Sequence, residues 1–342
     1  MNNTKKDNGS HSGGNAAAAD KNYEDLTFQD WFIFGKVMKN QQIFKGVLAR
    51  TLPDLDLTGI EFDIQNEAAI KETVHGRGIR SDVLGKTEDK IMDVEMQVSK
   101  ESALPYRFRY YGAVIDADNL SEGEDFRKLP FRAVIFLCAY KPYDDEKTEI
   151  VNTFVYQSKE HPGRYLNDGT VHVIINCTVQ ETDDEKYKEL TALNRYIMTQ
   201  KIEEGDTLVA SIDSNVKMAK NNNAWRKEYM EFREMMANSR NAGREEGLKE
   251  GQKLGDRRRA EIDQIEKAMD FIEFCEQLET PVEEAVAHGK ITLEQLQCCR
   301  DVRKWLAEHE GMTVEDYVDQ TMDIEGMLKQ EENNAEADKE NN

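Results

Sequence analysis

The side chains best suited to chemistry lie in the stretch RSDVLGKTEDKIMDVEMQ, residues 80–97. Asp82 belongs to one strand-like segment, and Glu95 and Gln97 lie two positions apart in the next, so these two side chains share a face. A hairpin through the polar connection 86–90 would bring Asp82 close to Glu95. Two carboxylates on one sheet face suit Mg²⁺ or another hard divalent cation, which takes oxygen ligands and keeps several waters. Such an ion polarises a phosphoryl oxygen and acidifies a bound water.

The same alternation also fits a half-buried strand with an ordinary solvent face. Val94, Met96 and Val98 would then form the apolar face, and the polar residues between them would be wet. Acidic and amide residues are common on such a face, so the pattern alone leaves both interpretations open. Asp93 shares the face of Glu95 but lies outside the candidate site, and we expect it to be solvent-facing.

The elements that must position these residues alternate between strand and helix. Residues 1–22 lack periodicity and are predicted to form a disordered arm. A helical pattern follows from Asp25 and ends before Pro53 and Gly59. The later segments are strand-like at 59–65, 78–85 and 90–98, helical at 102–118, strand-like at 131–140, 150–156 and 171–178, and helical from 185. This order predicts a mixed α/β (α+β) domain over residues 23–239.

A second region follows this domain. The glycines of NAGREEGLKEGQKLG, residues 241–255, recur every four positions, and each costs a helix about 1 kcal/mol relative to alanine. Residues 240–259 are therefore predicted to be a marginal helical linker, with helix–helix pairing as the alternative. Residues 260–330 read as short amphipathic helices, through which a homo-oligomer could form, and 331–342 as an acidic disordered tail.

Composition excludes several classes of protein. The 342 residues include 67 acidic and 45 basic side chains, for a net charge of −22, and no apolar run reaches the roughly 18 residues that span a bilayer. The five cysteines form no CxxC pair, which argues against a disulfide scaffold or zinc ribbon and favours a reducing, cytoplasmic setting. The acidic charge alone disfavours nucleic-acid binding. However, residues 310–342 carry 11 acidic and 2 basic groups, so the total says little about any one site.

Several short segments share their order with a known family. Between Leu26 and Gly255 the chain carries, in this order, the segments FIFGKVMKN, RSDVLGK, DVEMQ, RFRYY and HPGRYLNDG, followed by the repeat with a glycine at every fourth position. Their order and spacing resemble the recombination-promoting nucleases, a transposase-associated family of the PD-(D/E)XK nuclease superfamily. The resemblance implies a restriction-endonuclease-like core, in which a helix, a three-stranded antiparallel meander, a helix and a further strand form a mixed sheet flanked by helices.

The resemblance also implies roles for the candidate residues. Asp82 corresponds to the metal-binding aspartate and Glu95 to the second acidic ligand, while Gln97 stands where the wider superfamily usually carries lysine. Lysine can orient water, offset phosphate charge or act as a base, whereas an amide only donates and accepts hydrogen bonds near neutral pH. The implied function is a Mg²⁺-dependent DNA endonuclease linked to a mobile element or to recombination. The alternative is a weak or inactive nuclease-fold protein that acts as a DNA-binding or oligomeric module.

Other residues are candidates for accessory roles. Asp30, on the first helix, could supply a further acidic group or could be an exposed helix residue. Arg107, Arg109 and Tyr110 follow the acidic motif on the next helix. Arginines there could contact DNA phosphates and a tyrosine could stack on bases, or they could be ordinary surface and core residues.

Overall fold

The computed structural model describes residues 21–70, 79–100, 103–144, 149–288 and 290–330. The chain divides into two compact units, Met1–Met236 and Ala237–Asn342. The acidic tail at 331–342 and all but the last two residues of the expected disordered arm lie outside the described residues. In the described part of the chain, none of the helices has both the length and the apolar composition needed to cross a membrane.

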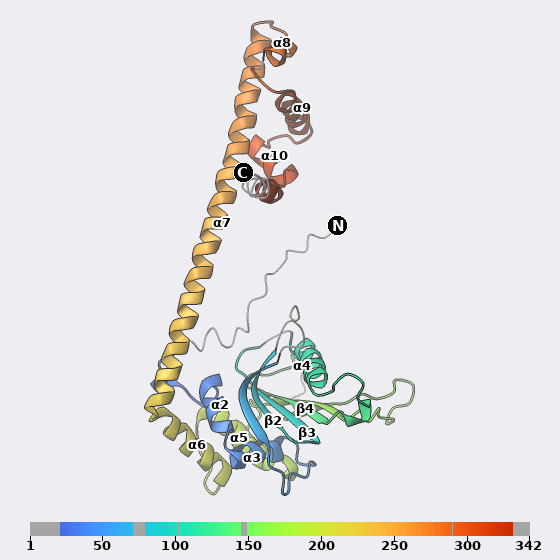
Figure 1. Cartoon of the computed structure of the whole chain (residues 1–342), viewed down its shortest axis with the longest axis vertical. Helices are drawn as coiled ribbons and strands as arrows, with labels where there is room; N and C mark the ends of the chain where they lie inside the picture. Colours follow the sequence, from blue (N-terminus) through green and yellow to red (C-terminus); the bar gives the residue numbers. More distant parts are fainter. Residues whose placement is uncertain (1–20, 71–78, 101–102, 145–148, 289, 331–342) are drawn as a thin grey trace. The chain divides into compact units, whose positions relative to one another are not determined.

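The first unit is built on a six-stranded mixed sheet with the strand order β1-β2-β3-β4-β6-β5 (Figure 1). The antiparallel meander β1-β2-β3 is joined in parallel by β4, β6 lies parallel to β4, and β5 forms an antiparallel edge. The strands are β1 (Asp63–Ile70), β2 (Ile79–Lys86), β3 (Lys90–Gln97), β4 (Phe131–Cys138), β5 (Val151–Phe154) and β6 (Thr170–Asn176). The predicted fold class, including the meander followed by a helix and a further strand, is confirmed.

Helices cover both faces of this sheet (Figure 1). The helix α4 packs on one face, and α2, α3, α5 and α6 pack on the other. Short 3₁₀ turns η1, η2 and η3 complete the unit. The bounds of these helices and 3₁₀ turns are η1 (Tyr23–Asp25), α2 (Trp31–Met38), α3 (Gln41–Thr51), α4 (Leu104–Asp118), η2 (Phe126–Lys128), η3 (Glu185–Tyr187), α5 (Lys188–Thr199) and α6 (Thr207–Lys220).

The strand β4 is apolar along its length because it is covered on both sides. Val134 and Phe136 pack toward α4, while Ile135 and Leu137 pack toward the opposite helical layer, and all four are fully buried. A strand covered on both faces needs a continuous rather than an alternating apolar sequence. The unbroken apolar run seen in the sequence therefore marks the middle of the sheet.

Several strand boundaries differ from those expected from the sequence, and β5 and β6 end at Phe154 and Asn176 rather than at residues 156 and 178. β1 begins at Asp63 rather than at residue 59, because Gly59 has a positive φ of 71° beside a turn in which the Ile60 N–H donates to the Leu57 carbonyl. β4 ends at Cys138 rather than at residue 140. The polar connection between β2 and β3 does form a hairpin, since the Thr87 N–H donates to the Lys90 carbonyl at 2.8 Å.

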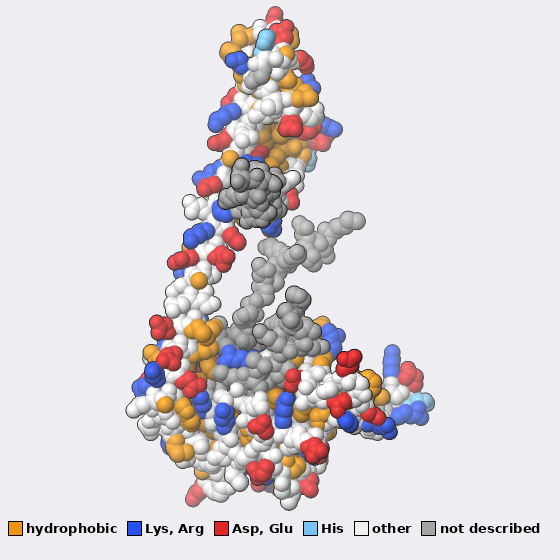
Figure 2. Space-filling model, viewed as in Figure 1, with side chains coloured by type: hydrophobic (Ala, Val, Ile, Leu, Met, Phe, Trp, Pro, Cys, Tyr) orange, Lys and Arg blue, Asp and Glu red, His pale blue; other side chains and the backbone are white. Residues whose placement is uncertain are grey.

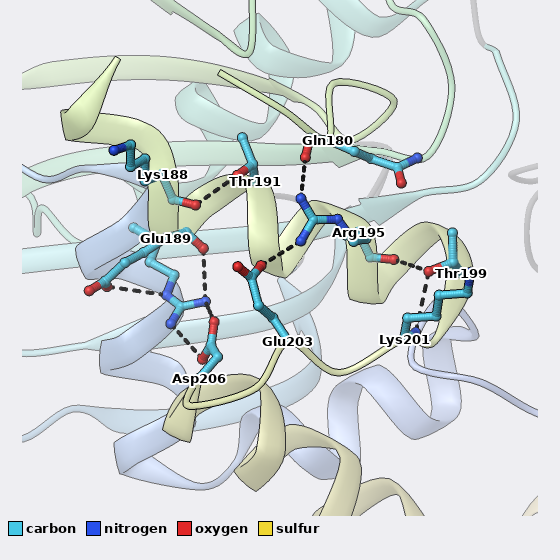
Figure 3. Close-up of polar contacts among 10 residues, drawn as sticks. Gln180, Lys188, Glu189, Thr191, Arg195, Thr199, Lys201, Glu203 and Asp206 are labelled. Atoms are coloured by element: carbon cyan, nitrogen blue, oxygen red, sulfur yellow. Dashed lines mark hydrogen bonds and ion pairs between the residues drawn. The ribbon is translucent and has the colours of Figure 1, made fainter. Parts of the chain in front are cut away.

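Polar contacts tie the helices beneath the sheet to one another. Arg50 of α3 donates both terminal nitrogens to the Asp206 carboxylate, at 2.8 and 2.7 Å, and one of them also to the Glu189 carbonyl of α5. Figure 3 shows Glu189 and Asp206 beside a second link, in which Arg195 reaches the Gln180 carbonyl and Glu203. Burial raises the pKa of Asp206, but the hydrogen bonds from Arg50 and the Val209 N–H outweigh it and hold the pKa below its usual value. The pair therefore stays ionised and joins α3, α5 and α6.

The helix α7 (Asn223–Gln277) is continuous over 55 residues and runs through the whole glycine repeat. The expected limits at 239 and 260 therefore fall inside one helix. Figure 2 shows acidic and basic side chains interspersed along it. Beyond it lie α8 (Val282–Ala287), α9 (Leu293–Glu308) and α10 (Val314–Thr321), and the second unit has a small core that includes Ile272, Leu296 and Val302.

Candidate active site

The strands β2 and β3 are joined differently at their two ends. Regular pairing runs from Lys86–Ile91 to Val83–Val94. Beyond it, the Asp82 N–H donates to Glu95 Oε1 at 2.8 Å, and the Met96 N–H donates to Asp82 Oδ2 at 3.0 Å. Each carboxylate thus accepts a backbone N–H from the other strand, where ladder bonds to carbonyl oxygens would otherwise continue. The two acids are held beside each other at the end of the regular pairing.

The polar face of β3 is buried rather than wet. Asp93 is 0 % exposed, Glu95 1 % and Gln97 9 %. Leu84 and Ile91 pack together with α4 on the side of the sheet that this helix covers. The interpretation of this strand as one with an ordinary solvent face is therefore wrong, because α4 covers that face. Carboxylates are rarely buried in this way without a partner or a bound cation.

Asp93 was expected to face solvent, and that expectation is also wrong. Its Oδ1 accepts a hydrogen bond from the Ser81 hydroxyl, and its Oδ2 is buried without a hydrogen-bond partner among the described residues. Burial, together with the negative charge of Asp82, raises the pKa of Asp93 to about 7, although Ser81 and Arg107 act in the opposite direction. Asp93 thus adds to a cluster of acids in which the negative charge exceeds the positive charge of Arg107.

Glu95 experiences the same forces. Burial is the largest, and the charges of Asp82 and Asp93 add to it, so that the pKa of Glu95 lies well above its usual value. Arg107 opposes this shift, with Nη2 at 3.0 Å from Glu95 Oε2. The ionised form of Glu95 therefore depends on a cation beside it.

Arg107 lies at the centre of the site. Its Nη1 donates to Gln97 Oε1 at 2.7 Å, and its Nη2 donates to Glu95 and, at 3.1 Å, to the Tyr111 hydroxyl. The rings of Tyr111 and Phe136 each lie 5.2 Å from the guanidinium carbon. The side chain is 18 % exposed, so it is held inside the site by contacts on several sides.

The remaining candidates lie apart from these contacts. Arg109 is exposed on α4 and lies 5.8 Å from the ring of Tyr106, and Tyr110 is partly buried against the apolar cluster under α4. Asp30 precedes α2 as its N-cap and is 4 % exposed, so it is not an exposed helix residue. Its carboxylate accepts from the Thr27 N–H at 2.7 Å and pairs with Lys21 at 2.7 Å.

Several contacts of the site were not predicted, and two of them involve residues outside the candidates named from the sequence. One is the hydrogen bond from Ser81 to Asp93, and the other is that from Arg107 to the Tyr111 hydroxyl. The second leaves a signal in the sequence, because residues four apart on a helix project from the same side. The first does not, since Ser81 and Asp93 lie on different strands and meet only after the strands pair.

The chemistry of the donor set fits a hard divalent cation. In the described ranges, no group of three or more His, Cys, Asp or Glu side chains could hold a metal ion. Asp82 and Glu95, which are held beside each other across β2 and β3, are the candidate protein ligands. Mg²⁺ commonly uses one or two carboxylates and completes its shell with water and substrate oxygens. Asp93 Oδ2, which has no hydrogen-bond partner among the described residues, and the raised pKa values of Asp93 and Glu95 mark a site whose acids are not fully balanced by Arg107.

Comparison with known proteins places the chain in a family. The family model for PD-(D/E)XK nuclease family transposases matches residues 22–246, which include all six strands and every candidate residue named above. No curated protein and no solved structure matched the chain. The matched region covers more than half of the chain and has the mixed sheet expected for this superfamily. The chain belongs to the PD-(D/E)XK nuclease family transposases.

Proposed function

We propose that this protein is a divalent-cation-dependent endonuclease that hydrolyses DNA phosphodiester bonds in the movement of a mobile element or in recombination. The observation that best supports the proposal is the pair Asp82 and Glu95, fixed across β2 and β3 by reciprocal bonds to backbone N–H groups. Family membership supports nuclease chemistry in general. The specific ion, Mg²⁺, and the use of DNA as substrate are part of the proposal.

The residues of the chain have separate roles in this proposal. Asp82 and Glu95 would hold the cation, which when bound supplies an acidified water and neutralises charge on the phosphate. Gln97 would hold the attacking water or a phosphate oxygen by hydrogen bonding, because an amide cannot accept a proton near neutral pH. Arg107 favours the ionised form of Glu95 and orients its carboxylate, so in this proposal its part is positioning rather than contact with DNA.

Contacts with DNA outside the reacting phosphate are assigned to the exposed side of α4. Arg109 is exposed there and is suited to a backbone phosphate, a contact that positions DNA without reading its sequence. Tyr110 is partly buried, which favours packing over base stacking. Asp30, already bonded to Thr27 and Lys21, would act only as a distant support.

The test is cleavage of supercoiled plasmid by the purified protein with Mg²⁺ or with a chelator. The informative variants are Asp82→Asn and Glu95→Gln, because an amide oxygen still accepts the backbone N–H while the anionic ligand is lost. We expect cleavage only with Mg²⁺ and a fall of roughly 10²-fold or more in each variant. Glu88→Gln, an exposed acid in the same hairpin, is the matched control and should cleave as the wild type does.

Two results would contradict the proposal. One is unchanged cleavage by folded Asp82→Asn and Glu95→Gln proteins, which would assign the activity to other residues or to a contaminant. The other is DNA binding without any Mg²⁺-dependent product, which is the behaviour expected of the alternative, a catalytically silent nuclease-fold protein.

A further inference from the structure

The Gln97 amide faces Arg107 in an orientation that chemistry dictates. Arg107 Nη1 lies 2.7 Å from Oε1 of Gln97. A guanidinium carries five N–H donors and no acceptor, so the amide atom that faces it must be the carbonyl oxygen. The NH₂ group of Gln97 therefore points away from Arg107, and the described residues provide no hydrogen-bond acceptor for it.

The guanidinium that imposes this orientation is itself fixed. It bonds Glu95 Oε2 at 3.0 Å and the Tyr111 hydroxyl at 3.1 Å, and it lies against the rings of Tyr111 and Phe136. Its planar fork contacts Glu95 and Gln97 with different nitrogens. A lysine ammonium is a compact point charge on a flexible stem and lacks this fork geometry.

We propose that Arg107 is a positioning residue that makes Gln97 a hydrogen-bond donor toward the reacting phosphate or its attacking water. This inference rests on the proposed function. The NH₂ group of Gln97 would then offer N–H donors as a lysine ammonium does, while the positive charge resides next to it on Arg107. Without Arg107, the amide could turn its oxygen toward the phosphate, where two acceptors would repel each other.

The first test is a double-mutant cycle in DNA cleavage. Arg107→Met keeps an apolar stem and removes the fork, and Arg107→Lys keeps a charge beside Glu95 and so protects folding. Both should lower kcat by roughly 10²-fold in the Gln97 protein. In a Gln97→Lys background the donor no longer depends on an amide orientation, so the same changes should cost less, and the loss that remains reflects the contact of Arg107 with Glu95. Equal losses in the two backgrounds would overturn the inference, because independent sites contribute additively.

The second test does not depend on activity. In ¹⁵N-labelled protein, the side-chain amide signal of Gln97 is identified by its loss in Gln97→Ala. Arg107→Lys and Arg107→Met should move this signal toward that of a free glutamine. Arg127→Met, which alters an arginine that is 90 % exposed, should leave it in place.

The two tests separate the failure of this inference from that of the proposed function. An amide signal of Gln97 that is unmoved in both Arg107 variants overturns the inference, even in an active nuclease. A folded wild type that cleaves no DNA with Mg²⁺ refutes the proposed function, and the donor role of Gln97 with it. Displacement of the amide signal together with rescue by Gln97→Lys supports the inference.

Discussion

Asp93 has no solvent to stabilise its charge, and this gives the protein a distinctive pH dependence. Burial and the nearby Asp82 charge raise its pKa to about 7, and the pKa of Glu95 shifts in the same direction. The folded state thus binds protons more tightly than the unfolded chain does. The stability that these groups contribute is complete below about pH 4 and is lost as the pH rises through about 7.

Asp93→Asn tests this dependence, because asparagine still accepts from Ser81 but does not ionise. Between pH 4.5 and 7.5, the free energy of unfolding of the wild type should fall relative to that of Asp93→Asn, by on the order of 1.4 kcal/mol for each unit of pKa shift. Denaturant titrations at several pH values measure the difference. Asp118→Asn, at an exposed position of α4, is the control, and parallel curves for wild type and Asp93→Asn would contradict the prediction.

At this scale the sequence indicated which residues share a face, but not whether that face is covered. The alternation of side chains along a strand places Asp93, Glu95 and Gln97 on one face, and the chemistry of these side chains suggests that a cation binds there. Their burial follows from α4, whose packing on the sheet is decided by the whole fold. Arg107 was recognised as a candidate cation, but its contacts with Glu95 and Gln97 require the distance between α4 and β3, which spacing along the chain does not give.

At Gly85, the strand β2 lies directly against a side chain of α3. A Cβ atom at this position would lie 2.4 Å from Cε1 and 2.5 Å from Cζ of Phe44, whose side chain is fully buried. The glycine within RSDVLGK therefore lets α3 pack directly on the sheet, one residue before the end of β2. This explains why a residue that weakens a strand occurs beside the site.

Gly85→Ala should consequently destabilise the first unit by about 1–3 kcal/mol, the usual cost of an overpacked core. Gly243→Ala on α7 is the opposite case, since nothing lies within 4 Å of its Cβ position, and it should stabilise the helix by about 0.5–1 kcal/mol. Far-UV circular dichroism during denaturation measures both. A neutral Gly85→Ala would mean that Phe44 moves aside without cost.

The elements themselves were largely predictable, and their ends were not. The meander, the helix after it and the central apolar strand all follow from periodicity and turn residues. β1 begins later than expected because its extent is set by pairing with β2 rather than by its own composition, which is polar. The glycine repeat was predicted to be only a marginal helical linker, because each glycine opposes helix, and its composition did not indicate one uninterrupted helix from Asn223 to Gln277.

On the scale of the whole molecule, the candidate site is confined to one unit. β2, β3 and α4 all lie within Met1–Met236, and α8, α9 and α10 lie within the other unit. α7 contributes to the first unit through Tyr229 and Phe232, which pack in its core. All the proposed catalytic residues therefore lie in the first unit, whose core includes only the first part of α7.

A protein that ends at Gly255 should accordingly keep Mg²⁺-dependent cleavage at close to the wild-type rate. It should also lose any oligomer that forms through the helices beyond that point, because their apolar surfaces would be removed. Cleavage assays and light scattering on the two proteins measure these properties. Complete loss of cleavage by a stably folded truncation would show that the second unit takes part in the reaction.

The reciprocal bonds at Asp82 and Glu95 have an evolutionary consequence. These carboxylates complete the pairing of two strands, so a relative without nuclease activity would still be selected to keep acceptors at both positions. Alanine would be disfavoured there on folding grounds alone, whereas asparagine and glutamine would retain the backbone bonds. An inactive member of this lineage would then be recognised by the replacement of both acids with their amides rather than with alanine.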